Sequence, residues 1–349
     1  MVLALRTPGS LPKRHPGAGT RPSGTIAATR YARIRAGGPL KPTFVQLLVC
    51  PRCGSELQLT VIAQLAQEIE TGELVCQQGH EFPIVGSVPR FVESEAYVQN
   101  FGFEWNVHAL TQLDTDSSDE SERTFRSKTG FTPEQLRGKR VLDVGCGMGR
   151  FSDVASKWGA TVVGVDLSRA VDAAQRNIGS RENIHIAQAN IFQLPFREET
   201  FDVIFSIGVL HHTPNPKAAF DNLPKLLRAD GKIAIWLYNG YDAFRWRFSD
   251  LYRRFTPRLP KRMLHSLAYA AIPLYYVYKI PGVGLFLRWI LPVSNHPKPR
   301  WRVLDTFDWY SPQYQWKHSY EEVFPWFEAH GLKDIRVLSV PVSVQGTKR

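Results

Sequence analysis

Four residues in the first quarter of the chain combine the side chains and the spacing that bind a metal ion. Cys50 and Cys53 form a C-x2-C pair, and after 22 intervening residues Cys76 and His80 form a C-x3-H pair. Three thiolates and one imidazole complete the tetrahedron that zinc prefers, and four protein ligands leave no open position for water. We therefore expect a structural zinc ion in a domain whose own core is small.

A second segment, VLDVGCGMGRF at 141–151, is suited to holding a ligand against bare backbone. An apolar run leads into Asp143, and Gly145, Gly147 and Gly149 follow at alternate positions. Glycine inside a helix or strand costs about 0.5–1 kcal/mol relative to alanine, so a cluster of glycines indicates a place where side chains are excluded.

The elements around these glycines are those of a βαβ unit. The run RVLDVG predicts a buried strand, FSDVASKWG a helix that ends at Gly159, and TVVGVD a second strand that ends in Asp166. A carboxylate at that strand tip can accept hydrogen bonds from both hydroxyls of a ribose. Dinucleotide-binding folds read G-x-G-x-x-G, whereas this loop reads G-x-G-x-G after Asp143. An acid there opposes a pyrophosphate and suits the cationic ligand S-adenosylmethionine.

Residues 138–240 resemble a class I S-adenosylmethionine-dependent methyltransferase domain. Besides the βαβ unit, the resemblance rests on QANIFQLPF at 188–196, FDVIFSIGVLHHTPNP at 201–216 and LLRADGKIAIWLY at 226–238. It implies an α/β, Rossmann-like fold with a seven-stranded mixed sheet, whose antiparallel sixth and seventh strands fit KDIRVLSVPVSVQG near the C-terminus.

The same resemblance assigns the residues that bind the cofactor. Asp143, Gly145 and Gly147 would frame the methionine end, Asp166 would bind the ribose, and Leu167 would lie against the adenine. Asn190, followed by Ile191, stands where an acid usually receives the adenine amino group. The amide oxygen of Asn190 can still accept that hydrogen bond, although it carries no charge.

One histidine is a candidate for catalysis. Methyl transfer requires a general base only if the acceptor must lose a proton, and the protein otherwise orients donor and acceptor. His211, after the fourth predicted strand, is the candidate base because the ordinary pKa of histidine is near 6.5. The alternative is that one of His211 and His212 packs at the strand end and the other is merely polar.

The metal-binding segment has resemblances of its own. Residues 48–91 resemble the zinc-ribbon modules that precede certain methyltransferases, including the family that methylates guanine in the large ribosomal RNA, whose pattern also ends in C-x3-H. The stretch FPIVGSVPRF is similar to small partner proteins that activate methyltransferases. Scattered thiols with an exposed histidine are the alternative interpretation.

About eighty residues separate the fifth predicted strand from HSYEEVFPWFEAHGL, a helix with a capping box at Ser319 and Glu322 and a stop at Gly331. Insertions at this point lie at the carboxyl ends of the strands, beside the donor methyl group, so residues 241–318 are a candidate acceptor lid. Their aromatic and arginine side chains suit an anionic or lipid-linked acceptor, or a peripheral membrane surface. RNA is an alternative partner for such side chains. The plainer explanation of the aromatic residues is that they pack in the core of a helical subdomain.

The net charge of +11 is concentrated in two segments. Residues 1–42 hold eight Lys or Arg and no acid, and residues 241–300 hold eleven against two acids, so the remainder is negative and does not resemble a nucleic-acid surface. Residues 1–42 are predicted to be disordered, with a transit peptide or a translated stretch ahead of the true start as alternatives. The sequence predicts no membrane-spanning helix, and its four cysteines favour a reducing, cytoplasmic setting over a disulfide framework.

The sequence therefore predicts a methyltransferase that acts at oxygen on a small-molecule, glycan or lipid-linked acceptor. The segment SIGVLHH lacks the aromatic–proline signature of amino-group nucleic-acid methyltransferases, which places base methylation of ribosomal RNA second. A non-catalytic binding or activating subunit is the third possibility, and the oligomeric state is left open. The expected segments are a basic tail (1–42), a zinc ribbon (43–95), a linker or helical cover (96–137), the cofactor-binding core (138–240), the lid (241–318) and a C-terminal helix with strands (319–349).

Overall fold

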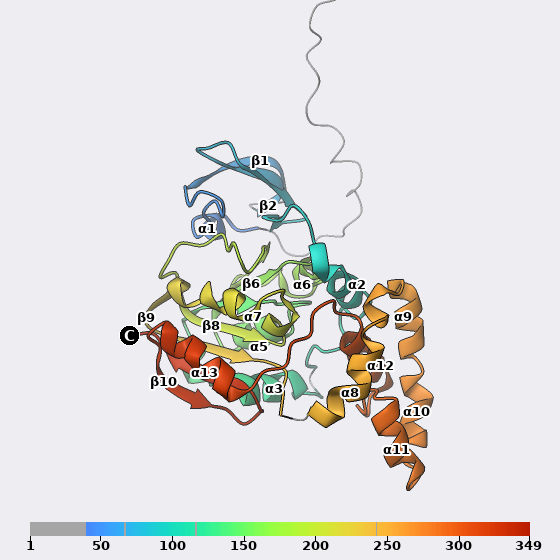
Figure 1. Ribbon diagram of the computed structural model, residues 1–349. Coiled ribbons are helices and arrows are strands. Elements are labelled where there is room, and N and C mark those ends of the chain that lie inside the picture. The colour runs from blue at the N-terminus through green and yellow to red at the C-terminus, as the bar shows by residue number, and fades with distance from the viewer. Residues whose placement is uncertain (1–39, 66–67, 116, 242) are drawn as a thin grey trace, which may run out of the picture. The chain divides into compact units, whose positions relative to one another are not determined.

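The strands of this protein form two separate sheets, one of four strands and one of seven. The computed structural model describes residues 40–65, 68–115, 117–241 and 243–349 (Figure 1). The predicted disordered tail at 1–42 lies almost entirely outside the described residues.

The seven-stranded sheet has the order β10-β11-β9-β8-β5-β6-β7. Neighbours from β7 to β9 pair in parallel, whereas β11 is antiparallel to both β9 and β10. This arrangement confirms the predicted Rossmann-like mixed sheet. Of the two strands that were expected to be antiparallel, β11 is reversed and β10 runs in the same direction as β9. The strands are β5 (Arg140–Val144), β6 (Thr161–Asp166), β7 (Ile184–Gln188), β8 (Phe201–Ile207), β9 (Leu227–Trp236), β10 (Lys333–Val337) and β11 (Ser343–Thr347).

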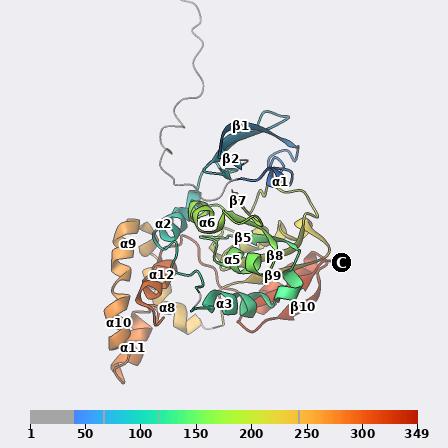
Figure 2. The same ribbon diagram turned by 180° about the vertical axis from the view of Figure 1, so that it is seen from behind.

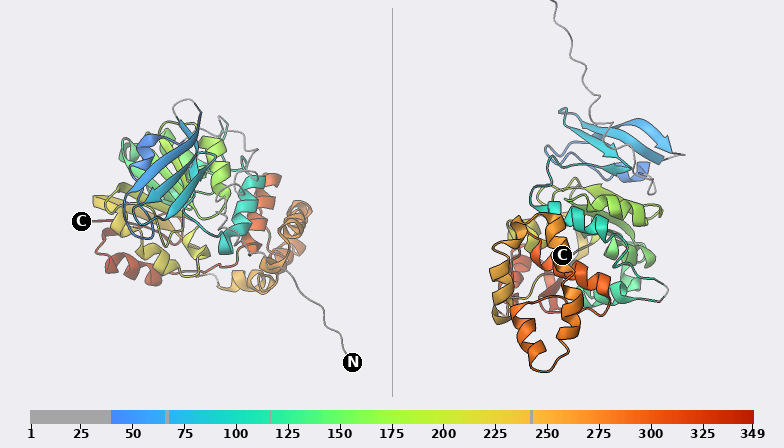
Figure 3. Two further views of the ribbon diagram at one scale, coloured as in Figure 1. Left: turned by 90° about the horizontal axis from the view of Figure 1, so that it is seen from above. Right: turned by 90° about the vertical axis from the view of Figure 1, so that its right-hand side faces the viewer.

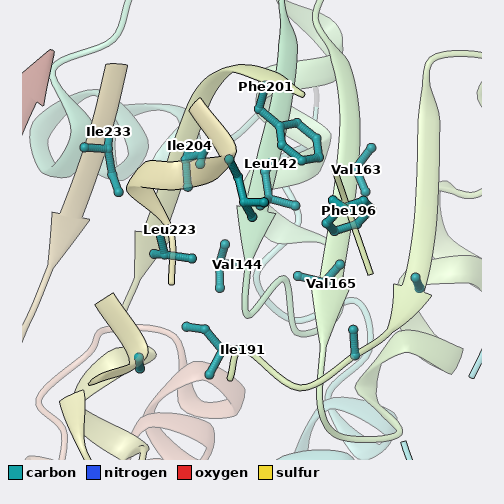
Figure 4. Close-up of a cluster of buried hydrophobic side chains, with 14 of the residues drawn as sticks. Leu142, Val144, Val163, Val165, Ile191, Phe196, Phe201, Ile204, Leu223 and Ile233 are labelled. Atoms are coloured by element: carbon teal, nitrogen blue, oxygen red, sulfur yellow. The ribbon is translucent and has the colours of Figure 1, made fainter. Parts of the chain in front are cut away.

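Helices cover both faces of this sheet because its strands are apolar on both sides. In β5, Leu142 and Val144 join one core cluster, and Val141 joins the cluster on the opposite face (Figure 4). The first face packs against α7 (Pro216–Asp221) and α13 (Tyr320–Ala329), and the second against α3 (Glu120–Thr129), α5 (Arg150–Lys157) and α6 (Ala170–Ile178), which Figure 2 shows from behind.

The local signals that predicted two of these helices operate in the structure. Helix α5 ends before Gly159, whose φ of +85° gives the left-handed turn that stops a helix. Helix α13 begins with the capping box of Ser319 and Glu322 and is followed by Gly331 at φ +67°. The helix predicted at 319–331 is therefore present with its expected ends.

The four-stranded sheet precedes the large one in the chain and packs against it. Phe44 stacks on His185 of β7 with 4.8 Å between the ring centroids, and Arg90 forms an ion pair of 2.5 Å with Asp172 of α6. Both partners of that ion pair are largely buried, so it fixes the small sheet on the core. The elements of this part are α1 (Pro42–Val45), β1 (Leu57–Leu65), β2 (Glu68–Cys76), β3 (Glu81–Val85) and β4 (Val88–Pro89).

The segment before β5 and the insertion after β9 are both mainly helical. The helices of the insertion lie together beside the large sheet (Figure 3), where Phe307 of α12 packs with Leu264 and Ala268 of α9. No helix within the described ranges is long and apolar enough to cross a membrane. The helices are α2 (Gln99–Val107) and α4 (Pro133–Leu136) before β5, then α8 (Ala243–Tyr252), α9 (Lys261–Ala268), α10 (Ala271–Val277), α11 (Val283–Ile290) and α12 (Pro299–Tyr310); 3-10 turns are Ala96–Val98, Leu210–His212, Pro224–Leu226 and Thr256–Arg258.

Candidate functional site

Each glycine of the loop after β5 has a different close neighbour, which leaves little or no room for a side chain. A Cβ on Gly145 would lie 2.3 Å from the Val209 side chain, and one on Gly149 would lie 2.5 Å from Ile178 of α6. Both glycines also have positive φ, at +83° and +94°. Gly147 faces the indole of Trp105, which a Cβ would approach to 3.3 Å. The loop is therefore close-packed against three neighbours while its backbone remains accessible at the carboxyl end of the strand.

This backbone borders a cavity of about 530 Å³ at the carboxyl ends of β5, β6, β8 and β9. Ligands of open α/β sheets bind at this end of the strands, where the order of connection reverses. The structure brings five of the predicted cofactor-binding residues to the cavity wall: Gly145, Gly147, Asp166, Leu167 and Ile191.

Asp166 holds the loop and the next helix together from the tip of β6. Its Oδ2 accepts a hydrogen bond of 3.0 Å from the Gly147 amide, and its Oδ1 accepts bonds from the amide and the hydroxyl of Ser168 at 2.8 and 2.7 Å. Burial raises the pKa of Asp166 above its ordinary value, and these hydrogen bonds act in the opposite direction. A carboxylate placed in this way is preorganised to accept further hydrogen bonds from a ligand in the cavity.

Two predicted residues lie behind the wall of the cavity. The carboxylate of Asp143 is buried and accepts a 2.7 Å hydrogen bond from Ser152 of α5, and burial raises its pKa to about 7. The side-chain oxygen of Asn190 accepts a hydrogen bond from the Phe192 amide at 3.1 Å. Neither residue belongs to the lining of the cavity, so direct contact of either side chain with a ligand remains a prediction.

The structure places His211, the predicted catalytic base, behind the wall of the cavity. Its ring is completely buried and stacks on Tyr238, whose amide donates to its Nδ1 at 3.3 Å. His211 is absent from the cavity lining, and burial lowers its pKa well below the ordinary value. The ring packs at the strand end, and its Nε2 has no hydrogen-bond partner within the described residues. A role for His211 as a base remains a prediction.

The neighbouring His212 lines the cavity instead. Its Nδ1 lies 2.8 Å from the carbonyl oxygen of Tyr314 and must donate to it, which leaves Nε2 as the hydrogen-bond acceptor. Burial lowers the pKa of His212 to about 3, so the imidazole is neutral near pH 7. A neutral imidazole of fixed tautomer can orient a hydroxyl group through Nε2.

The end of the cavity beyond the glycine loop is formed by residues that the sequence analysis did not single out. Lys128 of α3 places its Nζ 3.1 Å from the ring centroid of Trp236, and burial lowers its pKa to about 7. Tyr238 donates a 3.2 Å hydrogen bond to Asp308 of α12, and burial together with Asp305 raises the pKa of Asp308 to about 7. This end of the cavity therefore combines aromatic surface with groups that can exchange protons near neutral pH.

Helices from outside the βαβ core close the cavity. Tyr97, Phe101 and Trp105 come from the segment at 96–107, and Asp305 and Trp309 come from α12 of the insertion. The linker and the insertion thus both cover the carboxyl ends of the strands. Trp105, which faces Gly147, is part of the wall.

The four predicted metal ligands converge in the small sheet. Their ligand atoms all lie within 4.8 Å of one another. The Sγ atoms of Cys53 and Cys76 are 3.7 Å apart, and Nδ1 of His80 is 3.4 Å from Sγ of Cys50 and 3.3 Å from Sγ of Cys76. A zinc tetrahedron with Zn–S bonds of about 2.3 Å has S–S edges of about 3.8 Å, so the donor set and its spacing fit zinc.

Comparison with known proteins agrees with the fold of the central part. Residues 142–235 match the family described as "Methyltransferase domain". The chain is 37% identical over 100 residues to a ubiquinone biosynthesis O-methyltransferase from Coxiella burnetii, covering 28% of this chain and 43% of that protein. It is 32% identical over 138 residues to methyltransferase GfsG from Streptomyces halstedii, covering 37% of this chain and 50% of that protein. The chain thus spans half the length of these curated relatives or less.

Among solved structures, phosphoethanolamine N-methyltransferase 2 from Haemonchus contortus, in complex with S-adenosyl-L-methionine, aligns with 73% of this chain and 47% of its own. The sequence identity is 16% and the TM-score is 0.40.

Proposed function

We propose that the protein methylates an oxygen atom of a small-molecule, glycan or lipid-linked acceptor. The premise is that residues 142–235 form a class I S-adenosylmethionine-dependent methyltransferase domain. One observation carries the proposal. The glycine loop after β5 and the carboxylate of Asp166 border the same cavity, which continues to Lys128, His212 and Asp308. A donor site and a polar acceptor site therefore share one enclosed space.

The residues that would hold the donor follow from their places on the wall. The bare backbone at Gly145 and Gly147 allows close approach of the methionine end, and Asp166 would accept hydrogen bonds from the ribose hydroxyls. Leu167 and Ile191 would flank the adenine. When bound, S-adenosylmethionine supplies a methyl group on a positively charged sulfur. Asp143 would act through Ser152 on helix α5 and so support the loop from behind.

The acceptor end suits a hydroxyl group that loses a proton during transfer. His212 offers Nε2 as a hydrogen-bond acceptor that would orient the hydroxyl. The pKa of about 7 allows Lys128 to be neutral in part of the molecules at neutral pH, and a neutral amine can take the proton. The rings of Trp236, Tyr238 and Trp309 would enclose the acceptor and exclude water.

Binding of the donor is the first test. By calorimetry, wild-type protein should bind S-adenosylmethionine, and Asp166→Ala should weaken binding by at least about tenfold because hydrogen bonds to a charged group are lost. Glu198→Ala, an exposed acid of the same domain, should bind as the wild type does. Absence of donor binding by the wild-type protein would refute the assignment and favour a non-catalytic subunit.

Transfer to an acceptor is the second test. Protein incubated with methyl-labelled donor should label hydroxyl-bearing compounds in a small-molecule or lipid extract and leave purified ribosomal RNA unlabelled. Label that appeared only in the RNA would replace the proposal by base methylation of ribosomal RNA.

We further propose that Cys50, Cys53, Cys76 and His80 bind one structural zinc ion. The convergence of four ligand atoms supports this, and the set leaves no position for a substrate. None of the four cysteines forms a disulfide, which supports a reducing, cytoplasmic setting for the protein.

A further inference from the structure

The insertion carries an unusual concentration of positive charge. Residues 251–300 contain nine Lys or Arg and no Asp or Glu. These residues include helices α9, α10 and α11 and the start of α12. An acid-free segment of this kind produces a positive surface potential that attracts anionic partners.

The same segment exposes large apolar side chains. Of the eighteen exposed large hydrophobic residues in the described part of the chain, eleven fall between residues 251 and 291. On α11, Leu285 is 79% exposed and Phe286 is 59% exposed, and on α9 Met263 and Leu267 are each about half exposed one helical turn apart. Isolated exposed apolar residues are normal, whereas a concentration within one segment of about forty residues indicates a binding surface.

A basic groove adjoins this surface. It has a volume of about 860 Å³ and is lined by five cations, Arg253, Arg254, Arg258, Lys261 and Arg262, and by no acid. Within the described residues none of these five cations forms an ion pair, although Arg253 and Arg258 donate to backbone carbonyls and Lys261 donates to the side chain of Gln99. Tyr97 lines both the groove and the candidate active-site cavity, so an anionic group in the groove would lie beside that cavity.

We propose that the α9–α11 surface, residues 251–291, docks on an anionic lipid bilayer, with the cations of the basic groove facing the headgroup phosphates. Apolar side chains beside lysine and arginine are the composition of segments that bind the membrane interface without spanning the membrane. This inference rests on the proposed methyl transfer and deepens it, because a docked enzyme would receive its acceptor from the bilayer.

The observations favour a bilayer over two other occupants. A second copy of the chain would bring two acid-free, positively charged segments together, and like charges oppose such an interface. RNA would be held by stacking on aromatic rings, but most of the exposed apolar side chains here are aliphatic, such as Leu267, Ile280, Val283 and Leu285.

Vesicle binding tests the proposal with the full-length protein. Wild-type protein should sediment with vesicles of phosphatidylcholine and phosphatidylglycerol, less with vesicles of phosphatidylcholine alone, and less in high salt. The double variant Leu285→Ser/Phe286→Ser should lose about tenfold in partition to anionic vesicles because it removes apolar area from the interface. A matched control, Ile62→Ser/Leu110→Ser, changes residues that are equally exposed outside the insertion and should bind as the wild type does.

A second variant tests the charges. Arg254→Ser/Arg262→Ser should weaken binding to anionic vesicles and reduce its salt dependence, because both side chains are exposed and unpaired within the described residues. Donor binding should stay unchanged in all three variants. A variant that loses vesicle binding and keeps donor binding therefore tests the docking proposal alone. Failure of the wild-type protein to bind the donor would instead contradict the proposed function.

Three outcomes would overturn the docking proposal. The first is failure of the wild-type protein to bind anionic vesicles. The second is an equal loss of vesicle binding in Leu285→Ser/Phe286→Ser and in the control Ile62→Ser/Leu110→Ser. The third is a dimer in light scattering that Leu285→Ser/Phe286→Ser dissociates while vesicle binding is unchanged, which would assign this surface to a second copy of the chain.

Discussion

Substitution of Gly145 by alanine tests the physical basis of the donor loop. A Cβ at this position would lie 2.3 and 2.5 Å from the two γ-carbons of Val209, which is far inside van der Waals contact. The backbone is also left-handed at φ +83°, where a side chain adds strain. We expect Gly145→Ala to destabilise the fold and to displace the loop that borders the cavity.

The magnitude follows from these two contributions. Left-handed backbone costs a non-glycine residue about 1–2 kcal/mol, and overpacking costs about 1–3 kcal/mol. The free energy of unfolding should therefore fall by about 2–5 kcal/mol. Gly138→Ala is the matched control, because Gly138 has φ +71° but a Cβ there would meet no atom within 4 Å, so only the backbone contribution of about 1–2 kcal/mol applies.

Urea unfolding followed by tryptophan fluorescence measures these differences, and calorimetry measures donor binding in the same proteins. In a double-mutant cycle, Val209→Ala should recover part of the overpacking cost of about 1–3 kcal/mol in Gly145→Ala, because it removes both γ-carbons and leaves only the Cβ of residue 209, which would lie 2.8 Å from the new methyl group. The reasoning is refuted if Gly145→Ala costs no more than Gly138→Ala, or if its effect and that of Val209→Ala are additive.

Three further predictions concern proton transfer, the metal and acid stability. The rate of methyl transfer should rise with pH through about 7 as Lys128 loses its proton. In stopped assays, Lys128→Met should lower this rate about 100-fold and make it independent of pH in that range. Metal analysis should find one zinc per chain, lost in Cys53→Ser and kept in Cys146→Ser, which lies outside the cluster. Burial lowers the pKa of His185 in the folded protein to about 4, whereas its unfolded pKa is about 6.5. The free energy of unfolding should therefore fall as the pH falls below about 6.5. His185→Phe should remove about 2 kcal/mol of that loss at pH 5, measured by urea unfolding.

The donor half of the site could be predicted because its signals are local. A glycine loop between a strand and a helix, with an acid at the tip of the next strand, lies within 26 residues of sequence, from Val141 to Asp166. The backbone requirement for glycine and the chain connectivity of a βαβ unit then determine which residues meet. The C-x2-C and C-x3-H pairs are local in the same sense, since each pair lies on one turn.

The acceptor half could not be predicted in this way. Lys128 lies on α3, in a segment that the sequence suggested was a linker, and it meets Trp236 only because α3 packs across the sheet. The choice between His211 and His212 likewise depends on packing, because adjacent residues on a 3-10 turn point in different directions. No spacing in the sequence distinguishes these two histidines.

The sequence alone thus determined the elements, their order and the backbone loop that a donor requires, because hydrophobic period, glycine and capping residues act over a few positions. The tertiary structure decided which side chains face the cavity and what their pKa values are. Burial is a property of the assembled molecule, and it lowers the pKa of His211 while it brings the pKa values of Lys128 and Asp308 near 7.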